Sequence, residues 1–266
     1  MRLALGVAYD GSSFCGWQSQ PNGCGVQDVL ERALSEIAAQ PVTVVCAGRT
    51  DTGVHALEQV VHFDTTASRP LQAWVRGANA LLPSAVAVQW AEEVAEDFHA
   101  RFQAERRCYR YILFNHPVRP ALWAGKVGWF HVPLDVAAMQ QAAAYLLGQH
   151  DFSAFRAAEC QAKSPLKHMY EARIERQGDF IVFHFCANAF LHHMVRNLVG
   201  SLVYVGKGSH APEWIVQLLH ERDRSKAAPT FAPDGLYLER VIYPADAGLP
   251  QAVGGSASVP LPFAGA

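Results

Sequence analysis

The sequence lacks the hydrophobic run that a membrane helix needs, since no stretch of about eighteen consecutive apolar residues occurs in it. Its first residues, Met1 to Gly6, are too few and too soon interrupted by Arg2 to form the apolar core of a signal peptide. Charged residues are also few, at 17%, while half of the residues are apolar, as in an ordinary globular protein. We therefore expect a cytoplasmic protein with no membrane partner.

Paired cysteine motifs and metal-ligand spacings are also missing. The six cysteines lie far apart without a Cys-x-x-Cys pair, which favours reduced, mostly buried thiols over a disulfide framework or a zinc site. The twelve histidines include His192-His193, but no His-Glu-x-x-His spacing occurs. Neither a Gly-x-Gly-x-x-Gly or Walker loop nor the Gly-x-Ser-x-Gly elbow of a hydrolase occurs. The sequence thus predicts no metal and no cofactor.

The pattern of apolar residues predicts the same order of elements twice. Strands are expected at 3–9, 42–46, 59–63 and 85–90, with helices at about 26–39 and from residue 70. After a charged junction at 94–106, strands are expected at 108–114, 170–176, 180–186 and 235–243. The helices expected there cover about 134–147, 190–205 and a short segment after Pro212.

Two β-α-β-β-α-β units in tandem suggest an α+β protein with two ferredoxin-like or RRM-like halves. Their strands would form a mixed, mainly antiparallel sheet with a central cleft, where a site is expected. We predict an N-terminal half at 1–100 and a C-terminal half at 101–244. The Ala-, Gly-, Ser- and Pro-rich residues 245–266 are expected to form a disordered tail.

The loop at residues 48–56 is the leading candidate for a site. It joins two predicted strands but exceeds the about two to five residues of a tight hairpin. Glycines at 48 and 53 frame Arg49 and Asp51, so the backbone can turn sharply or approach a ligand. An aspartate in a loop more often caps its own backbone, but a carboxylate beside an arginine on a strand pair makes Asp51 the leading catalytic candidate.

The predicted helix at 190–205 is apolar except for His192, His193, Arg196 and Asn197. His192 and Arg196 are four residues apart and would share a helix face. If this face is buried, Arg196 needs a carboxylate partner, because an unpaired buried arginine costs several kcal/mol. Asp51 is the partner we expect, and the pair would hold it ionised. A solvated face is an equally good interpretation of the sequence.

Arginines and aromatic residues are interleaved between residues 98 and 111. The arginines are Arg101, Arg106, Arg107 and Arg110, and the aromatic residues include Phe98, Phe102, Tyr109 and Tyr111. Arginine suits phosphate and aromatic rings suit unstacked bases, although a strand with a charged edge is at least as good an explanation. Tyr109 and Tyr111 point to one face of the strand, so one of them could lie beneath the loop of Asp51.

A set of motifs in a fixed order resembles the TruA-type tRNA pseudouridine synthases along about residues 3–243. They include Tyr9-Asp10-Gly11, Gly16-Trp17-Gln18, Gly48-Arg49-Thr50-Asp51, Gly53-Val54-His55-Ala56, Phe98-His99-Ala100-Arg101, Arg107-x-Tyr109-x-Tyr111, Phe190-Leu191-x-His193-Met194-Val195-Arg196-Asn197 and Gly235-Leu236-Tyr237-Leu238. The resemblance implies isomerisation of uridine to pseudouridine in the anticodon stem-loop of tRNAs, at tRNA positions 38, 39 and 40, without cofactor or metal.

The resemblance also implies a role for each matching residue. Asp51 would be the essential aspartate, acting as nucleophile or as the base that removes a sugar proton. Tyr109 would stack on the uracil and can take its C5 proton, Arg196 would pair with Asp51, Arg49 would displace the target base, and Leu236 would wall the pocket. The segments expected to touch tRNA are Phe98, His99, Ala100, Arg101 and Phe102, and Glu159, Cys160, Gln161, Ala162 and Lys163. Members of the family act as homodimers.

Two departures and two alternatives remain. Thr52 stands where the family often has alanine, and Ser19 replaces an arginine, so a phosphate contact there is in doubt. A catalytically silent RNA-binding protein of two RRM-like units is the main alternative, although no RNP1 string occurs. A nucleoside or sugar hydrolase would need a second acid close to Asp51.

Overall fold

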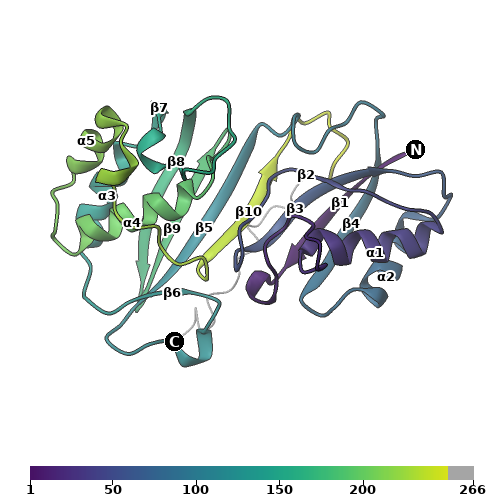
Figure 1. Cartoon of the computed structure of the whole chain (residues 1–266), viewed down its shortest axis with the longest axis horizontal. Helices are drawn as coiled ribbons and strands as arrows, with labels where there is room; N and C mark the ends of the chain where they lie inside the picture. The colour runs from purple at the N-terminus through teal and green to yellow at the C-terminus, as the bar shows by residue number, and fades with distance from the viewer. Residues whose placement is uncertain (251–266) are drawn as a thin grey trace.

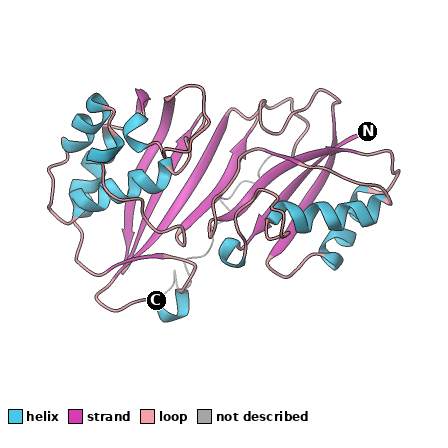
Figure 2. Ribbon diagram, viewed as in Figure 1, coloured by secondary structure: helices cyan, strands magenta, loops and turns pink. Residues whose placement is uncertain are grey.

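A computed structural model of the chain describes residues 1–250, and its strands form one ten-stranded sheet. Helices α1 and α2 lie over one end of this sheet and α3, α4 and α5 over the other (Figure 1). The central strands β3, β10 and β5 lie between these two groups of helices (Figure 2). The mixed α+β fold with a mainly antiparallel sheet is confirmed, since only β10–β3 and β5–β6 pair in parallel.

The N-terminal elements follow the predicted order closely. They are β1 (Arg2–Tyr9), the short 3-10 helix η1 (Gly11–Ser13), α1 (Val26–Ala38), β2 (Val45–Cys46), β3 (His55–Asp64), α2 (Leu71–Leu81) and β4 (Val86–Val94). Helix α1 forms because Val26, Leu30 and Leu34 recur at helical spacing, and all three are buried against the sheet.

The C-terminal elements contain the same series with additions. They are β5 (Arg106–Asn115), η2 (Ala121–Trp123), β6 (Gly128–Phe130), α3 (Val136–Ala144), β7 (Gly148–Asp151), η3 (Ser153–Phe155), β8 (Leu166–Gln177), β9 (Phe180–Ala187), α4 (Met194–Gly206), α5 (Trp214–Glu221), η4 (Arg224–Lys226) and β10 (Leu236–Ile242). The hairpin expected at residues 177–179 joins β8 to β9. Strands β6 and β7 were not predicted.

The sheet order is β4-β1-β3-β10-β5-β9-β8-β7, with β2 beside β3. In each half the fourth strand of the repeated unit therefore lies beside the first, followed by the third and the second. The halves join where β10 pairs with β5 on one side and, through Tyr237 and Leu238, with His55 and Ala56 of β3 on the other. The last strand thus builds a single sheet from the two repeated units.

Helix α4 begins later than its apolar pattern predicts. We expected a helix from about residue 190, but α4 starts at Met194, and His193 has the left-handed φ of 59° at its N-cap. His192 therefore lies before the helix, and the expectation that His192 and Arg196 share a helical face is wrong. Residues 188–193 instead form a loop that leads from β9 to the site.

The expectation of reduced, unpaired thiols is wrong for four of the six cysteines. Cys15 is bonded to Cys24, and Cys108 to Cys186, which is its cross-strand neighbour on β9. Cys46 and Cys160 are free. The cysteines therefore do not by themselves support a reducing compartment.

The expected C-terminal tail is described only in part. Residues 245–250 follow β10, and Ala247 N donates a hydrogen bond to Pro244 O at 3.1 Å. The remainder of the expected disordered segment, 251–266, lies outside the described residues. None of the helices in residues 1–250 combines the length and the apolar composition needed to span a membrane.

Candidate active site

The loop at residues 47–54 is fixed to the strands on both sides of it. Ala47 N donates to Val60 O at 2.8 Å, and the side chain of Gln59, which is fully buried, bonds both backbone groups of Gly48. Trp17 N donates to Thr50 O at 3.0 Å, and the Thr50 hydroxyl lies 2.7 Å from Tyr9 Oη. Asp51 is therefore presented by a rigid loop, as a reacting group must be.

Three positively charged or ionisable groups of the C-terminal half meet the Asp51 carboxylate. Arg196 Nη1 donates to Asp51 Oδ2 at 3.2 Å, so the expected pair is present. His193 Nε2 lies 3.3 Å from the same oxygen, and His192 Nε2 lies 3.3 Å from Oδ1. The Asp51 side chain is 23% exposed, so both of its oxygens are bonded while part of it stays open to solvent.

The start of α4 brings these groups to Asp51. Arg196 lies in the first turn, and its Nε donates to Phe231 O at 2.8 Å, which leaves Nη1 for the carboxylate. His193 is the N-cap residue, so the carboxylate lies near the helix N-terminus, where the helix dipole favours negative charge. Arg196 and the helix N-terminus thus place positive charge beside the Asp51 carboxylate.

Tyr109 lies beneath the loop, as the strand alternation predicts. It is buried, its ring meets the edge of Phe190 at a centroid distance of 5.1 Å, and a Cβ on Gly48 would lie 3.8 Å from its hydroxyl oxygen. Burial raises the pKa of Tyr109, and the negative charge of Asp51 adds to this effect. The phenol is therefore neutral at ordinary pH.

The other residues expected in the pocket lie in different settings. Arg49 is exposed next to Asp51, and no hydrogen bond or ion pair of its side chain is found within residues 1–250. Leu236 is buried opposite Tyr111 at the start of β10. Its position follows from the loop at residues 231–235, which also bonds Arg196 and His55.

The first segment expected to touch tRNA, residues 98–102, is only partly open. Phe98 and Ala100 are buried, and Ala100 N donates to His62 Nδ1 at 3.1 Å. Phe102 is 76% exposed, and the Arg101 guanidinium lies 5.7 Å from the centre of its ring. Arg101 and Phe102 are thus the accessible members of this segment, with His99 half-buried beside them.

The second expected segment, residues 159–163, lies against the histidine loop. Cys160 is buried and its Sγ accepts a hydrogen bond from His192 N at 3.3 Å, while Arg156 binds the carbonyls of Cys160 and Ala162. Glu159, Gln161 and Lys163 are exposed. This segment therefore contacts His192 through Cys160 and exposes its other side chains to solvent.

Arg107 and Arg110 do not serve as open phosphate ligands. The buried Arg107 guanidinium donates to the carbonyls of Ala47, Arg101 and Asn188, so it ties three loops together. Arg110 is also buried and pairs with Glu239. Of the four arginines in this region, Arg101 and Arg106 are exposed, and Arg106 stacks on Tyr170 at 4.1 Å.

The cluster could supply three metal ligands, one atom each from Asp51, His192 and His193, all within 4.8 Å of one another. However, Arg196 binds the same carboxylate oxygen as His193, and its positive charge opposes a cation there. We therefore do not assign a metal centre, and the absence of a metal requirement stays a prediction.

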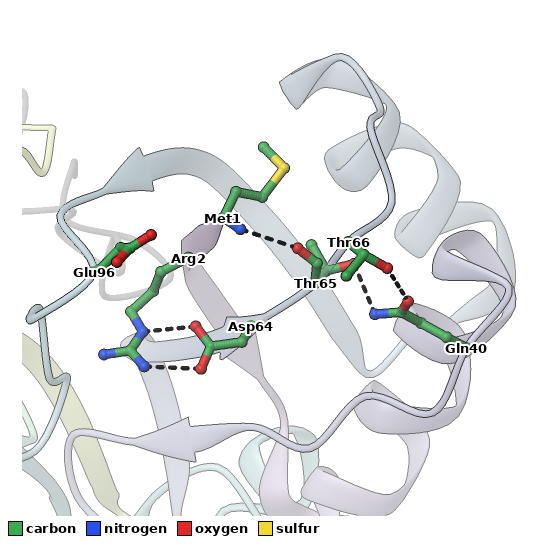
Figure 3. Close-up of a pocket in the computed structure, with 7 residues that line it drawn as sticks. All are labelled: Met1, Arg2, Gln40, Asp64, Thr65, Thr66 and Glu96. Atoms are coloured by element: carbon green, nitrogen blue, oxygen red, sulfur yellow. Dashed lines mark hydrogen bonds and ion pairs between the residues drawn. The ribbon is translucent and has the colours of Figure 1, made fainter.

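Two pockets found in residues 1–250 do not include Asp51. One is lined by Met1, Arg2, Gln40, Asp64, Thr65, Thr66 and Glu96, and Figure 3 shows bonds that join Arg2 to Asp64, Met1 to Thr65 and Gln40 to both threonines. Arg2 makes two hydrogen bonds of 2.8 Å to Asp64, and the amino terminus donates to Thr65 O. The other is lined by residues of β7, β8 and α5. The chemistry is concentrated instead at Asp51.

Comparison with known proteins shows the family of the chain. The family model for tRNA pseudouridine synthases matches residues 6–103 and 142–244. The chain belongs to the tRNA pseudouridine synthase family. The expected enzyme class, an isomerase that forms pseudouridine in tRNA, is thereby confirmed at the level of the family.

Several curated relatives are similar over almost their whole length. The tRNA pseudouridine synthase A of Dechloromonas aromatica is 62% identical over 94% of this chain and 96% of its own. The enzyme of that name from Methylobacillus flagellatus is 64% identical over 94% of this chain and 96% of its own. The one from Paraburkholderia phymatum is 60% identical over 96% of this chain and 96% of its own. A solved Cbf5-Nop10-Gar1 complex aligns with a TM-score of 0.38 at 12% identity, covering 89% of this chain and 48% of that one.

The two histidines at Asp51 are the part of the site that the sequence did not assign. The signal was present, since His192 and His193 stand beside Arg196 in an otherwise apolar stretch. Periodicity placed them on a helix, where adjacent residues point about 100° apart and only one could face Asp51. The left-handed turn at His193 brings both rings to the carboxylate.

Proposed function

We propose that this chain isomerises uridine to pseudouridine in the anticodon stem-loop of tRNAs, with Asp51 as the one essential acid. The observation that carries the proposal is the ion pair between Asp51 and Arg196, which joins the two halves at 3.2 Å. It supplies an ionised carboxylate on a rigid loop, in a chain that is about 60% identical to enzymes named for this reaction.

Asp51 acts on the sugar of an extruded nucleotide. A uridine inside a stem hides its glycosidic bond, so the target must leave the stack, and exposed Arg49 next to Asp51 is placed to fill the space it vacates. Asp51 then attacks C1′ or removes a sugar proton, and the N1–C1′ bond breaks. The freed uracil turns between Tyr109 and Leu236, and its C5 bonds to C1′ as the Asp51–C1′ bond breaks or as Asp51 returns the sugar proton.

The surface around the site fits an RNA substrate. Arg101 over Phe102 and Arg106 over Tyr170 pair a cation with an exposed ring, which suits both phosphates and unstacked bases. With the exposed Glu159, Gln161 and Lys163, they form the tRNA-binding surface of the proposal. We further propose that the protein is cytoplasmic and that each chain consists of two halves that meet at about residue 100. We also propose that two chains form a homodimer, which sedimentation with and without tRNA tests.

The proposal is tested by the conversion of unmodified tRNA transcripts by the protein and by its Asp51→Ala variant. Pseudouridine is mapped base by base, and tRNA binding is measured in the same samples. We expect modification in the anticodon arm to fall by about 10⁴-fold or more in Asp51→Ala while binding persists. The exposed neighbour supplies the matched control, Thr52→Ala, which should keep the activity.

The competing function, a silent RNA-binding protein, predicts a different result. Both proteins would then bind tRNA and neither would form pseudouridine. Release of free uracil by the unaltered protein would instead indicate a hydrolase. Modification outside the anticodon arm would keep the enzyme class and overturn the proposed target.

A further inference from the structure

The proposed reaction leaves one proton without an acceptor. After C5 of the uracil has bonded to C1′ of the sugar, C5 still carries its hydrogen. The C5–H bond must break, its electron pair restores the C5=C6 double bond, and the proton must go to a base. The identity of that base is inferred here on the premise of the proposed function.

Neither Tyr109 nor Asp51 is well suited to take this proton. The raised pKa of Tyr109, caused by burial and by the charge of Asp51, keeps its phenol protonated, and a neutral phenol is a poor base. Both carboxylate oxygens of Asp51 already have partners, Arg196 and His193 at Oδ2 and His192 at Oδ1. Imidazole is the remaining kind of base that contacts Asp51.

The two histidines are not equivalent. His193 shares Asp51 Oδ2 with Arg196 and is 27% exposed, whereas His192 alone binds Oδ1 and is 40% exposed. Burial lowers the pKa of His193, and the charges of His192 and Arg196 add to this, while Asp51 opposes it. His192 is therefore the histidine with open space around it and one carboxylate oxygen to itself.

The backbone holds His192 in this position at a local cost. Its N–H donates to Cys160 Sγ at 3.3 Å, and its carbonyl accepts from Ala157 N at 3.1 Å. The next residue, His193, has a φ of 59°, a left-handed conformation that is strained for a non-glycine residue. Such strain is common at functional sites, and here it turns both rings toward Asp51.

We propose that His192 is the general base that accepts the C5 proton, and that Asp51 Oδ1 stabilises the imidazolium that forms. The proton moves from C5 to a ring nitrogen of His192 and from there to solvent, while N1 of the uracil gains a proton, so the atoms balance for an isomerisation. The groups in contact with His192 are Asp51, His193 and Cys160, and the charges of Arg196 and Glu159 act on the adjacent His193. Asp51 opposes the repulsion from Arg196 and His193.

The test compares His192→Gln with His193→Gln, on tRNA carrying protium or deuterium at C5 of uridine. Glutamine keeps a hydrogen-bond donor for Asp51 but is not basic. We expect His192→Gln to bind tRNA normally and to form pseudouridine about 10²–10⁴-fold more slowly. Its rate should fall severalfold further with deuterium, because C5–H cleavage has become rate-limiting. His193→Gln should be slower without that isotope effect.

The pH profile provides a second readout. His192→Gln should change the pH dependence of the rate, because a glutamine in place of the base does not ionise. A slow His192→Gln enzyme with no isotope effect and an unchanged pH profile would mean that His192 only positions Asp51. An isotope effect in His193→Gln alone would assign the base to His193. Either result overturns the proposal, and absence of pseudouridine with the unaltered protein overturns the proposed function itself.

Discussion

The two halves of the molecule differ most in the second strand of the repeated unit. In the C-terminal half this strand is β8, with 12 residues, and a tight turn at Gly178 joins it to β9. In the N-terminal half it is β2, with two residues, and the chain from Cys46 to His55 forms the loop of Asp51 instead. The carboxylate of Asp51 therefore lies where the second strand of the repeated unit is short.

The shortened strand has a second consequence for the sheet. Because β2 covers only Val45 and Cys46, the start of β3 is free to pair with β10. This pairing brings the C-terminal half against the loop, with β10 beside β3 and α4 facing Asp51. One half thus supplies the acid, and the other supplies the arginine, the histidines and the tyrosine.

The largest effects are expected from breaking an ion pair between the halves and one within a half. Arg196→Met removes the partner of Asp51 and should lower the rate of pseudouridine formation by about 10²–10³-fold, because the carboxylate loses its orientation and its stabilising charge. The free energy of unfolding should change little, since the Arg196–Asp51 pair is partly exposed. Arg196→Lys, which keeps the charge, should recover part of the rate.

Arg110→Met is the matched control within the C-terminal half. Arg110 and Glu239 are more buried than the pair at the site, with side chains 9% and 14% exposed, and strand alternation places Arg110 on the face opposite Tyr109. The variant should lose about 3 kcal/mol of unfolding free energy, because the half-buried Glu239 loses its arginine and keeps His184 as its neighbour. Its rate should be unchanged below its melting temperature. Urea unfolding and tRNA conversion together test the contrast, which fails if both arginine variants lose the same property.

A smaller effect is expected from adding one carbon to a glycine in each half. A Cβ on Gly16, whose φ is 97°, would lie 2.9 Å from Thr50 O and 3.1 Å from the backbone of Asp51 and Thr52. Gly16→Ala should lower the unfolding free energy by about 2–3 kcal/mol. It should also slow the reaction by about 10²-fold, because the catalytic loop must shift.

Gly178, in the tight turn between β8 and β9, is the glycine of the other half used for comparison. Its φ is 59°, and nothing lies within 4 Å of the position of an added Cβ. Gly178→Ala should cost about 1–2 kcal/mol through its left-handed backbone alone, with an unchanged rate. If both variants lose stability but neither slows the enzyme, Gly16 does not support the loop in the way the contacts indicate.

The sequence predicted the elements whose own residues carry a long pattern. Helix α1 and strands β1 and β9 were expected almost at their observed bounds, because periodic burial against one core is a local signal. Strands β6 and β7 were missed, because these short segments are strands only through their neighbours, Leu113–Asn115 and Leu166–Met169. The place of β10 between the halves is also a long-range property that no local pattern contains.

The ion pair of the candidate site could be predicted, because a buried charged side chain needs a partner of opposite charge. The pairing of Arg196 with Asp51, 145 residues apart, followed from the cost of an unpaired arginine in an apolar helix. The histidines were not assigned, because their approach to Asp51 depends on a left-handed φ at His193 that a non-glycine residue seldom adopts. The Cys15–Cys24 and Cys108–Cys186 bonds were missed because sequence spacing does not reveal pairing.

The smallest expected effect is a loss of unfolding free energy at low pH. It is tested by comparing one histidine on each third strand of the repeated unit, β3 and β9. Burial lowers the pKa of His62 on β3 to about 4, and its neutral Nδ1 accepts the hydrogen bond from Ala100 N. An unfolded histidine titrates near pH 6.5. The stabilisation is therefore complete above about pH 6.5 and is lost as the pH falls toward 4, by about 1–2 kcal/mol between pH 7 and pH 5.

His62→Asn should remove this dependence, because an amide oxygen can accept from Ala100 but does not titrate in this range. On β9, His184 lies within 4 Å of the carboxylates of Glu175 and Glu239, and within residues 1–250 its ring accepts no backbone hydrogen bond like the one at His62. His184→Asn should therefore leave the acid dependence in place, as measured by urea unfolding at pH 7, 6 and 5. Ala100 belongs to the proposed tRNA-binding segment. The affinity for tRNA should therefore weaken as the pH falls in the unaltered protein and in His184→Asn, but not in His62→Asn. Equal acid sensitivity in His62→Asn and the unaltered protein would show that other groups cause it.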